Sequence, residues 1–115
     1  HRYMDVGTSH GCYRVDRRSH RINRFYYEAE YPNSDRNFFV NSIAYQDARH
    51  IWIATDGGGL CLYDFKTHQG RVYTTAEMLP SNHVFALVKT SDGRLWVSTD
   101  KGLAFMSQGD GPQLL

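Results

Sequence analysis

Residues 51–64 read IWIATDGGGLCLYD, and much of this stretch returns further along the chain. Residues 95–106 read LWVSTDKGLAFM, so that the two tryptophans lie 44 residues apart, as do the two threonines. A weaker copy, MDVGTSHGCYRVD, occupies residues 4–16, and its threonine lies 47 residues before Thr55. The chain of 115 residues therefore contains three copies of one unit.

A repeat of roughly 40 to 50 residues with strand patterns inside it is typical of β-propeller blades. The best-preserved strand places Trp52 and Ala54 on one face and Ile51 and Ile53 on the other. A strand that is apolar on both faces is covered on both sides, as it is in a blade packed between two others. We therefore predict an all-β chain of four-stranded antiparallel blades of about 44 residues, with Trp52 and Trp96 in the structural core.

The strand patterns divide the chain into three parts. We expect a partial, degenerate blade over residues 1–37, a complete blade over 38–78 and a blade without its last strand over 79–115. In the first part Asp5 stands where the later copies have tryptophan, which predicts a weaker core there. A closed propeller takes at least about four blades. About two and a half blades therefore predict part of a larger propeller, either within a longer protein or closed by further copies of this chain.

Composition argues against several classes of protein. The formal net charge of +1 gives no sign of nucleic acid binding, and no apolar run approaches the roughly 18 to 20 residues of a membrane span. When the repeats are aligned, Cys12 and Cys61 fall at positions that face opposite ways, so we expect buried free thiols and no disulfide. No paired cysteines or closely spaced histidines indicate a metal site, and we expect no cofactor.

Five arginines lie close together in the first part of the chain. They are Arg14, Arg17, Arg18, Arg21 and Arg24. One interpretation is a patch for an anionic ligand, such as a sulfated or acidic glycan. The alternative is a solvated hairpin, whose charges discourage pairing with another sheet edge.

The second and third copies resemble the two-component regulator propeller repeat. The resemblance is carried by residues 51–60, 63–64, 82–84, 92–99 and 102–103. The chain departs from the usual wording at Ala54 and Ser98, where the family prefers glycine, and at Asp5, where it prefers tryptophan. Together the copies cover most of the chain.

In that family such repeats build the extracytoplasmic sensor propellers of membrane-bound hybrid two-component histidine kinases, many of which sense products of glycan breakdown. The resemblance implies a periplasmic, non-catalytic segment that responds to an oligosaccharide or another small molecule. It further implies signalling through rearrangement of a homodimer, with the remaining blades and the kinase elsewhere in a longer chain.

No catalytic motif stands out in the sequence. It has no Gly-x-Ser-x-Gly elbow and no phosphate loop, and the glycine-rich residues 55–59 join two strands instead of preceding a helix. Two alternatives to a sensor stay open. One is a scaffold for protein–protein interaction, and the other is part of a propeller lyase or hydrolase whose acid and base lie in other blades.

Propeller geometry predicts which loops gather into a site. The turns between the second and third strands of a blade lie on the same face as the connections between blades. Polar groups that converge on such a face are the usual start of a binding site. Our ligand-binding candidates on these loops are His10, Arg36, Asn37, Asp56, His83 and Lys101, with Asp35 and Asn82 beside them. A purely structural turn role is the alternative for each of them, above all for Asp56 and Asn82.

Overall fold

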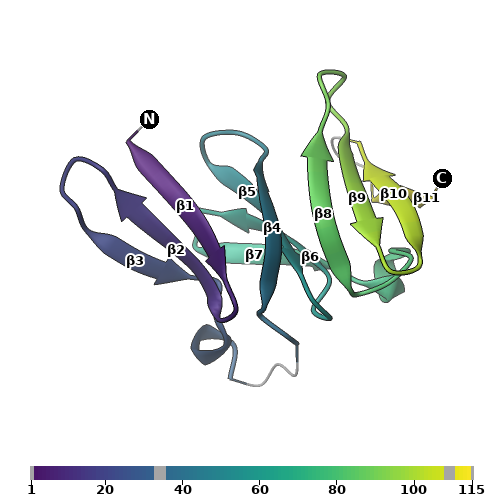
Figure 1. The fold of residues 1–115 in the computed structure, drawn as a ribbon, viewed down its shortest axis with the longest axis horizontal. Coiled ribbons are helices and arrows are strands. Elements are labelled where there is room, and N and C mark those ends of the chain that lie inside the picture. The colour runs from purple at the N-terminus through teal and green to yellow at the C-terminus, as the bar shows by residue number, and fades with distance from the viewer. Residues whose placement is uncertain (1, 33–35, 108–110, 115) are drawn as a thin grey trace.

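The computed structural model describes residues 2–32, 36–107 and 111–114 of the chain. Three antiparallel sheets stand side by side in chain order, and each is a blade (Figure 1). The first contains β1 (Tyr3–Thr8), β2 (Gly11–Asp16) and β3 (Ile22–Phe25). The second contains β4 (Val40–Tyr45), β5 (His50–Thr55), β6 (Leu60–Asp64) and β7 (Gln69–Tyr73). The third contains β8 (Val84–Lys89), β9 (Leu95–Thr99), β10 (Gly102–Met106) and β11 (Pro112–Leu114).

The connections between blades carry the only helical turns of the described residues. They are two short 3-10 segments, η1 (Glu28–Glu30) and η2 (Thr75–Glu77). A capping box holds η2, in which Thr74 and Glu77 satisfy each other's backbone N–H groups. No helix in the described part of the chain is long and apolar enough to cross a membrane.

The third blade has a last strand, contrary to our expectation. β11 pairs antiparallel with β10, with Ala104 opposite Leu114 and Met106 opposite Pro112. The strand is three residues long and begins at a proline, so it shows neither alternation nor β-branched residues. Proline is tolerated at the first residue of an edge strand, where no partner needs its missing N–H.

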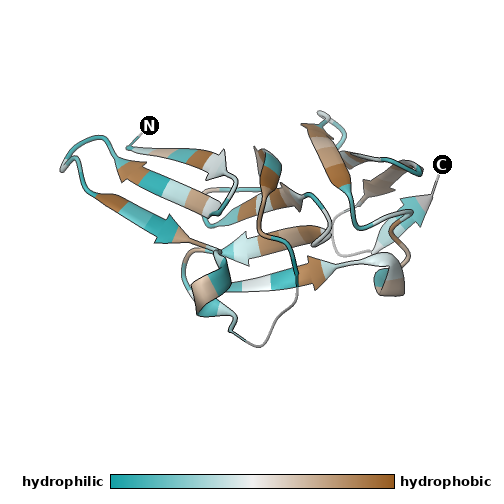
Figure 2. Ribbon diagram, turned by 60° about the horizontal axis from the view of Figure 1, so that its bottom comes forward, coloured by the Kyte–Doolittle hydropathy of each residue, from teal (hydrophilic) through white to brown (hydrophobic). Residues whose placement is uncertain are grey.

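Apolar side chains form one core between each pair of neighbouring blades. Figure 2 shows hydrophobic residues concentrated in the strands and a hydrophilic turn between β2 and β3. The core between the first and second blades contains Cys12, Phe25, Tyr26, Phe38, Val40, Ile51, Ile53, Cys61 and Tyr63. The core between the second and third contains Trp52, Ala54, Leu60, Tyr73, Leu79, Val84, Leu95, Val97 and Met106. β5 therefore contributes to both cores, as its two-faced pattern predicts.

The two cysteines are free and wholly buried. They lie on opposite faces of their own blades, and this places both of them in the same core, where the first blade meets the second. Burial raises the pKa of each thiol to about 12. Both are therefore protonated, unreactive core residues at neutral pH.

One hydrogen bond recurs in all three blades and explains why the three copies share a threonine and a glycine around this turn. The signature threonine hydroxyl donates to the carbonyl of the glycine that begins the next strand or immediately precedes it. The pairs are Thr8 to Gly11, Thr55 to Gly59 and Thr99 to Gly102, over 2.7–2.8 Å. All three glycines have positive φ, between 84° and 132°. Residues other than glycine rarely adopt this backbone conformation. We call this unit the hydroxyl clamp.

The two tryptophans occupy corresponding positions but different surroundings. Trp52 is 6% exposed and packs against the third blade. Trp96 lies on the outer face of the third blade, where its ring contacts Phe105 across the strand pair at 5.1 Å. Its indole N–H donates to Thr90, as that of Trp52 donates to Gln46. Trp96 is half-buried, and its outer face is not covered within the described chain.

Candidate functional site

The β5–β6 turn and the β7–β8 connection are joined at one face of the molecule. The backbone N–H groups of Gly57 and Gly59 both donate to the carbonyl of Asn82, at 3.0 and 2.9 Å. Beside them, Nδ1 of His83 lies 2.9 Å from Oδ1 of Asp56. Roughly half of each of these two side chains is exposed, so the pair is accessible and contributes little to stability.

The β3–β4 connection joins the same group. The N–H of Asp56 donates to the carbonyl of Phe39 at 2.9 Å. Asn37 packs so closely that a Cβ on Gly58 would lie 2.3 Å from its carbonyl oxygen. The Asn37 side chain accepts the N–H of Phe39 and thereby fixes its own turn. We call Asn37, Asp56 and His83 the loop-face site.

The other candidates come from the same or neighbouring loops. Among the described residues, their side chains form no hydrogen bond or ion pair with the loop-face site. Lys101 is in the β9–β10 turn, whose Asp100 donates its N–H to the carbonyl of His83 at 3.4 Å. His10 is in the β1–β2 turn, with Nδ1 3.7 Å from a carboxylate oxygen of Glu28. The guanidinium of Arg36 lies over the rings of Tyr31 and Phe38. Asp35 lies outside the described residues.

The loop-face site presents a carboxylate, an imidazole and an amide. An Asp–His pair resembles the base and orienting group of a hydrolase, but the neighbouring Ser81 is buried and its hydroxyl accepts the backbone N–H of His83. That hydroxyl helps to hold the β7–β8 connection. In the described residues no group of three acidic, histidine or cysteine side chains could hold a metal ion. What remains is an accessible set of donors and acceptors on three loops.

The five arginines do not form one patch, which corrects one interpretation of the sequence. Arg14 lies opposite Asn23, whereas Arg24 lies opposite Tyr13, so the two arginines are on different faces of the sheet. Arg14 faces the second blade and forms an ion pair with Asp5. Arg24 lies over the ring of Tyr27. The remaining three, Arg17, Arg18 and Arg21, are exposed in the β2–β3 hairpin.

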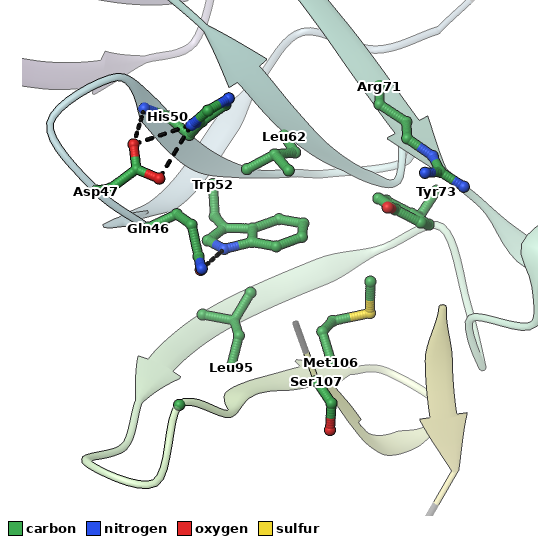
Figure 3. A pocket seen from close by; sticks show the side chains of 11 residues that line it. Gln46, Asp47, His50, Trp52, Leu62, Arg71, Tyr73, Leu95, Met106 and Ser107 are labelled. Atoms are coloured by element: carbon green, nitrogen blue, oxygen red, sulfur yellow. Dashed lines mark hydrogen bonds and ion pairs between the residues drawn. The ribbon is translucent and has the colours of Figure 1, made fainter. Parts of the chain in front are cut away.

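A second hollow lies between the second and third blades, at the side of the β4–β5 and β8–β9 turns (Figure 3). It measures about 240 Å³ and is lined by Gln46, Asp47, His50, Trp52, Leu62, Arg71, Tyr73, Gly93, Leu95, Met106 and Ser107. The indole of Trp52 lines it and donates its N–H to Gln46 at 3.0 Å. This volume is below the roughly 300–1,000 Å³ of small-molecule sites.

No direct signal for this hollow is present in the sequence, because its residues come from several strands and turns of two blades. Arg71 is exposed and lies over the ring of Tyr73 at 4.9 Å. His50 is the first residue of β5 and contacts both carboxylate oxygens of Asp47. The alternation of β5 and β7 could have placed Trp52 and Arg71 on one face, but not the gap between blades.

Comparison with known proteins bears on the repeat and on the fold. A family model described as the two component regulator propeller matches residues 78–101. The comparison with curated proteins found no match.

A solved structure resembles the chain over nearly its whole length. It is the extracellular domain of a protein described as a hybrid two component system, BT3049, from B. thetaiotaomicron. The likeness has a TM-score of 0.78 at 18% identity and covers 98% of this chain but 15% of that one. At this identity the likeness concerns the fold. Residues 78–101 therefore match the family model of the two component regulator propeller, in a chain that folds as successive blades of a β-propeller.

Proposed function

We propose that this chain is a non-catalytic, ligand-sensing segment of an extracytoplasmic propeller in a hybrid two-component histidine kinase. The observation that carries the proposal is the agreement of two findings: the family match at residues 78–101 and the shared fold over 98% of the chain. The solved relative in fold is described as an extracellular domain. An extracytoplasmic, periplasmic location is the corresponding expectation for this chain.

The loop-face site is where we propose that the ligand binds. Asn37, Asp56 and His83 come from three separate connections and are held together by backbone hydrogen bonds. Such a site is set by the scaffold and offers polar groups without having to fold around the ligand. Hydroxyl-rich molecules suit it, because a carboxylate, an imidazole and an amide offer both donors and acceptors. A glycan-derived oligosaccharide is our proposed ligand, and rearrangement of a dimer is the proposed signal.

The test is a binding screen on the full chain with a library of oligosaccharides, followed by calorimetric titration of each hit. The double variant Asp56→Ala/His83→Ala is expected to weaken binding at least tenfold. The matched control is Asp92→Ala/Arg94→Ala, which removes an exposed ion pair at 3.9 Å in the β8–β9 turn, at the other end of the blades. Loss of binding in the control alone would place the site elsewhere, and turnover of an oligosaccharide would overturn the non-catalytic proposal.

A further inference from the structure

The junction of the first and second blades breaks the pattern of the repeat. In the second blade Trp52 lies opposite Leu62, and both face the next blade. The corresponding pair in the first blade is Asp5 opposite Arg14. An indole and an aliphatic side chain are thus replaced by a carboxylate and a guanidinium. Departures from a local rule are expected at functional sites.

Asp5 and Arg14 are held in the junction by burial and by hydrogen bonds. The Asp5 side chain is wholly buried, and its two oxygens accept from Nε and Nη2 of Arg14 at 2.8 and 3.0 Å. Tyr45, from the second blade, donates its hydroxyl to the same carboxylate at 2.5 Å. Burial, followed by this hydrogen bond, raises the pKa of Tyr45 to about 12, so the hydroxyl keeps its proton. The Arg14 guanidinium lies over the ring of Phe65 at 3.5 Å.

A hollow of about 630 Å³ opens at this junction. It is lined by Arg2, Tyr3, Met4, Asp5, Arg14, Arg17, Tyr45, Asp47 and Ala48. It corresponds in place to the smaller hollow beside Trp52, because Asp5 and Arg14 take the positions of Trp52 and Leu62. The small carboxylate leaves open the space that an indole occupies at the next junction. Its volume is within the range of small-molecule sites, about 300–1,000 Å³.

The charges of the wall favour an anion. Three guanidinium groups line the hollow against two carboxylates. Arg14 forms an ion pair with Asp5, and Arg2 forms an ion pair with Asp16 at 2.9 Å. Asp47 is engaged by His50 and by the backbone N–H of Arg49. Arg17 makes no ion pair with any described residue, so its guanidinium is the cation that a ligand can take up.

The apolar part of the wall favours a ring. Tyr45 is 48% exposed and Tyr3 is 39% exposed, and both line the hollow. The ring of Tyr3 already has the Arg14 guanidinium over it at 4.3 Å. The ring of Tyr45 is fixed by its hydroxyl and offers its surface to the hollow. Aromatic rings of this kind bind the apolar faces of sugars and of aromatic molecules alike.

We propose that this hollow binds a small ring-bearing carboxylate, with the ring against Tyr45 and the carboxylate at Arg17. The proposal deepens the sensor function proposed above by adding an acid-selective site at a second place, and it rests on that function. Both a sugar acid and an aromatic acid carry this chemistry. Two features therefore define the ligand: a planar or hexose ring, and one anionic group beside it.

The test is calorimetric titration of the full chain with two matched pairs of probes. Glucuronate is compared with glucose, and 4-hydroxybenzoate with 4-hydroxybenzyl alcohol. We expect one acid to bind at least tenfold more tightly than its neutral counterpart, and the acid that does so identifies the source as sugar or aromatic. The proposal is overturned if neither acid binds, or if acids and neutral counterparts bind alike.

Two variants assign the binding to this hollow. Arg17→Gln should weaken binding of the acid about tenfold, whereas Arg21→Gln, an exposed arginine of the same hairpin outside the wall, should leave it unchanged. Asp5→Trp/Arg14→Leu restores the pair of the second blade and should abolish binding while circular dichroism shows the strands intact. Equal loss in both arginine variants, or retained binding in a folded Asp5→Trp/Arg14→Leu chain, would contradict the assignment. Oligosaccharide binding that depends on Asp56 and His83 while both acids fail would leave the sensor function standing without this site.

Discussion

The indole of Trp52 is the largest side chain between the second and third blades. It is 6% exposed, and Tyr73 lies against it with ring centroids 6.0 Å apart. Its N–H donates to Gln46, whose side-chain oxygen also accepts from Lys89 of the third blade. The residue therefore fills the core and also orders the polar edge of the junction.

Truncation of this residue should be costly. Trp52→Ala is expected to lower the free energy of unfolding by about 3–5 kcal/mol, the range for a large core aromatic cut to alanine. Trp96→Ala, on the uncovered face of the third blade, is the matched control and should cost clearly less. Urea unfolding followed by circular dichroism measures both. Equal losses would show that covering by the next blade is not what makes Trp52 important.

Asp5 makes contacts that could not be predicted from the sequence. The loss of tryptophan predicted a weaker core at the first junction. The structure instead contains a buried ion pair with Arg14, closed by the hydroxyl of Tyr45. Nothing in the local pattern links these three residues, because Tyr45 comes from the next repeat. Removal of one partner of a buried ion pair strongly destabilises the folded protein, because the other charge is left unpaired.

At the scale of strands and turns, an ion pair recurs at the end of β2 and of β6. Arg2 donates through Nε and Nη2 to Asp16, and Arg49 does so to Asp64. Each carboxylate also accepts backbone N–H groups of the turn that follows, those of Arg18 and Ser19 in one case and of Lys66 in the other. These hydrogen bonds, led by the arginine, hold the pKa of both aspartates well below the usual range.

This lowering has a consequence for stability in acid. A carboxyl group whose pKa is lower in the folded chain stabilises the fold above its unfolded pKa of about 3.9. That contribution is lost as the pH falls below about 4. Unfolding should then take up at most about one proton for each of the two aspartates.

The measurement is the urea midpoint between pH 2 and pH 6. Asp16→Asn/Asp64→Asn should lose less stability than the parent over the same decrease in pH. Asp100 is exposed in the β9–β10 turn and forms no ion pair with a described residue, so Asp100→Asn is the control and should behave like the parent. A double variant as acid-sensitive as the parent would mean that other carboxyl groups control the response.

Element boundaries followed from sequence to the extent that they depend on local pattern. β6, β9 and β10 lie within the repeated stretches 51–64 and 95–106, where a turn with glycine separates each strand from its neighbour. β11 was missed because three residues after a proline carry no period. The loop-face site was only partly predictable: Asp56 and His83 were separate candidates, and their pairing depends on how two loops pack together.

At the scale of the whole molecule, the outer faces of the first and third blades are apolar. Val88, Trp96 and Phe105 form a row on the third blade in the same register as the buried row that contains Trp52. Val88 is 59% exposed and Leu103 is 38% exposed. On the first blade, Met4 and Ile22 are exposed at 42% and 63%. Exposed apolar faces of this kind mark sites of association.

We therefore expect the chain alone to associate at increasing concentration. Sedimentation velocity over a hundredfold range of concentration should show a mass above 13.3 kDa at the upper end. Val88→Lys/Leu103→Lys should shift this chain towards the monomer. Met78→Lys replaces an apolar loop residue that is 63% exposed, and it serves as the control. A parent chain that stays monomeric throughout would show that these faces do not drive self-association.

The hydroxyl clamp has a consequence for how such a protein can change over evolutionary time. A threonine and a glycine at the ends of each turn supply the hydrogen bond that holds it, so the side chain directly after the threonine is not needed to form the turn. This position holds Ser9 in the first blade and an aspartate, Asp56 or Asp100, in the other two. New residue types can therefore appear at this position without loss of the scaffold. The side chains that the loops present are thereby free to diverge faster than the architecture that holds them.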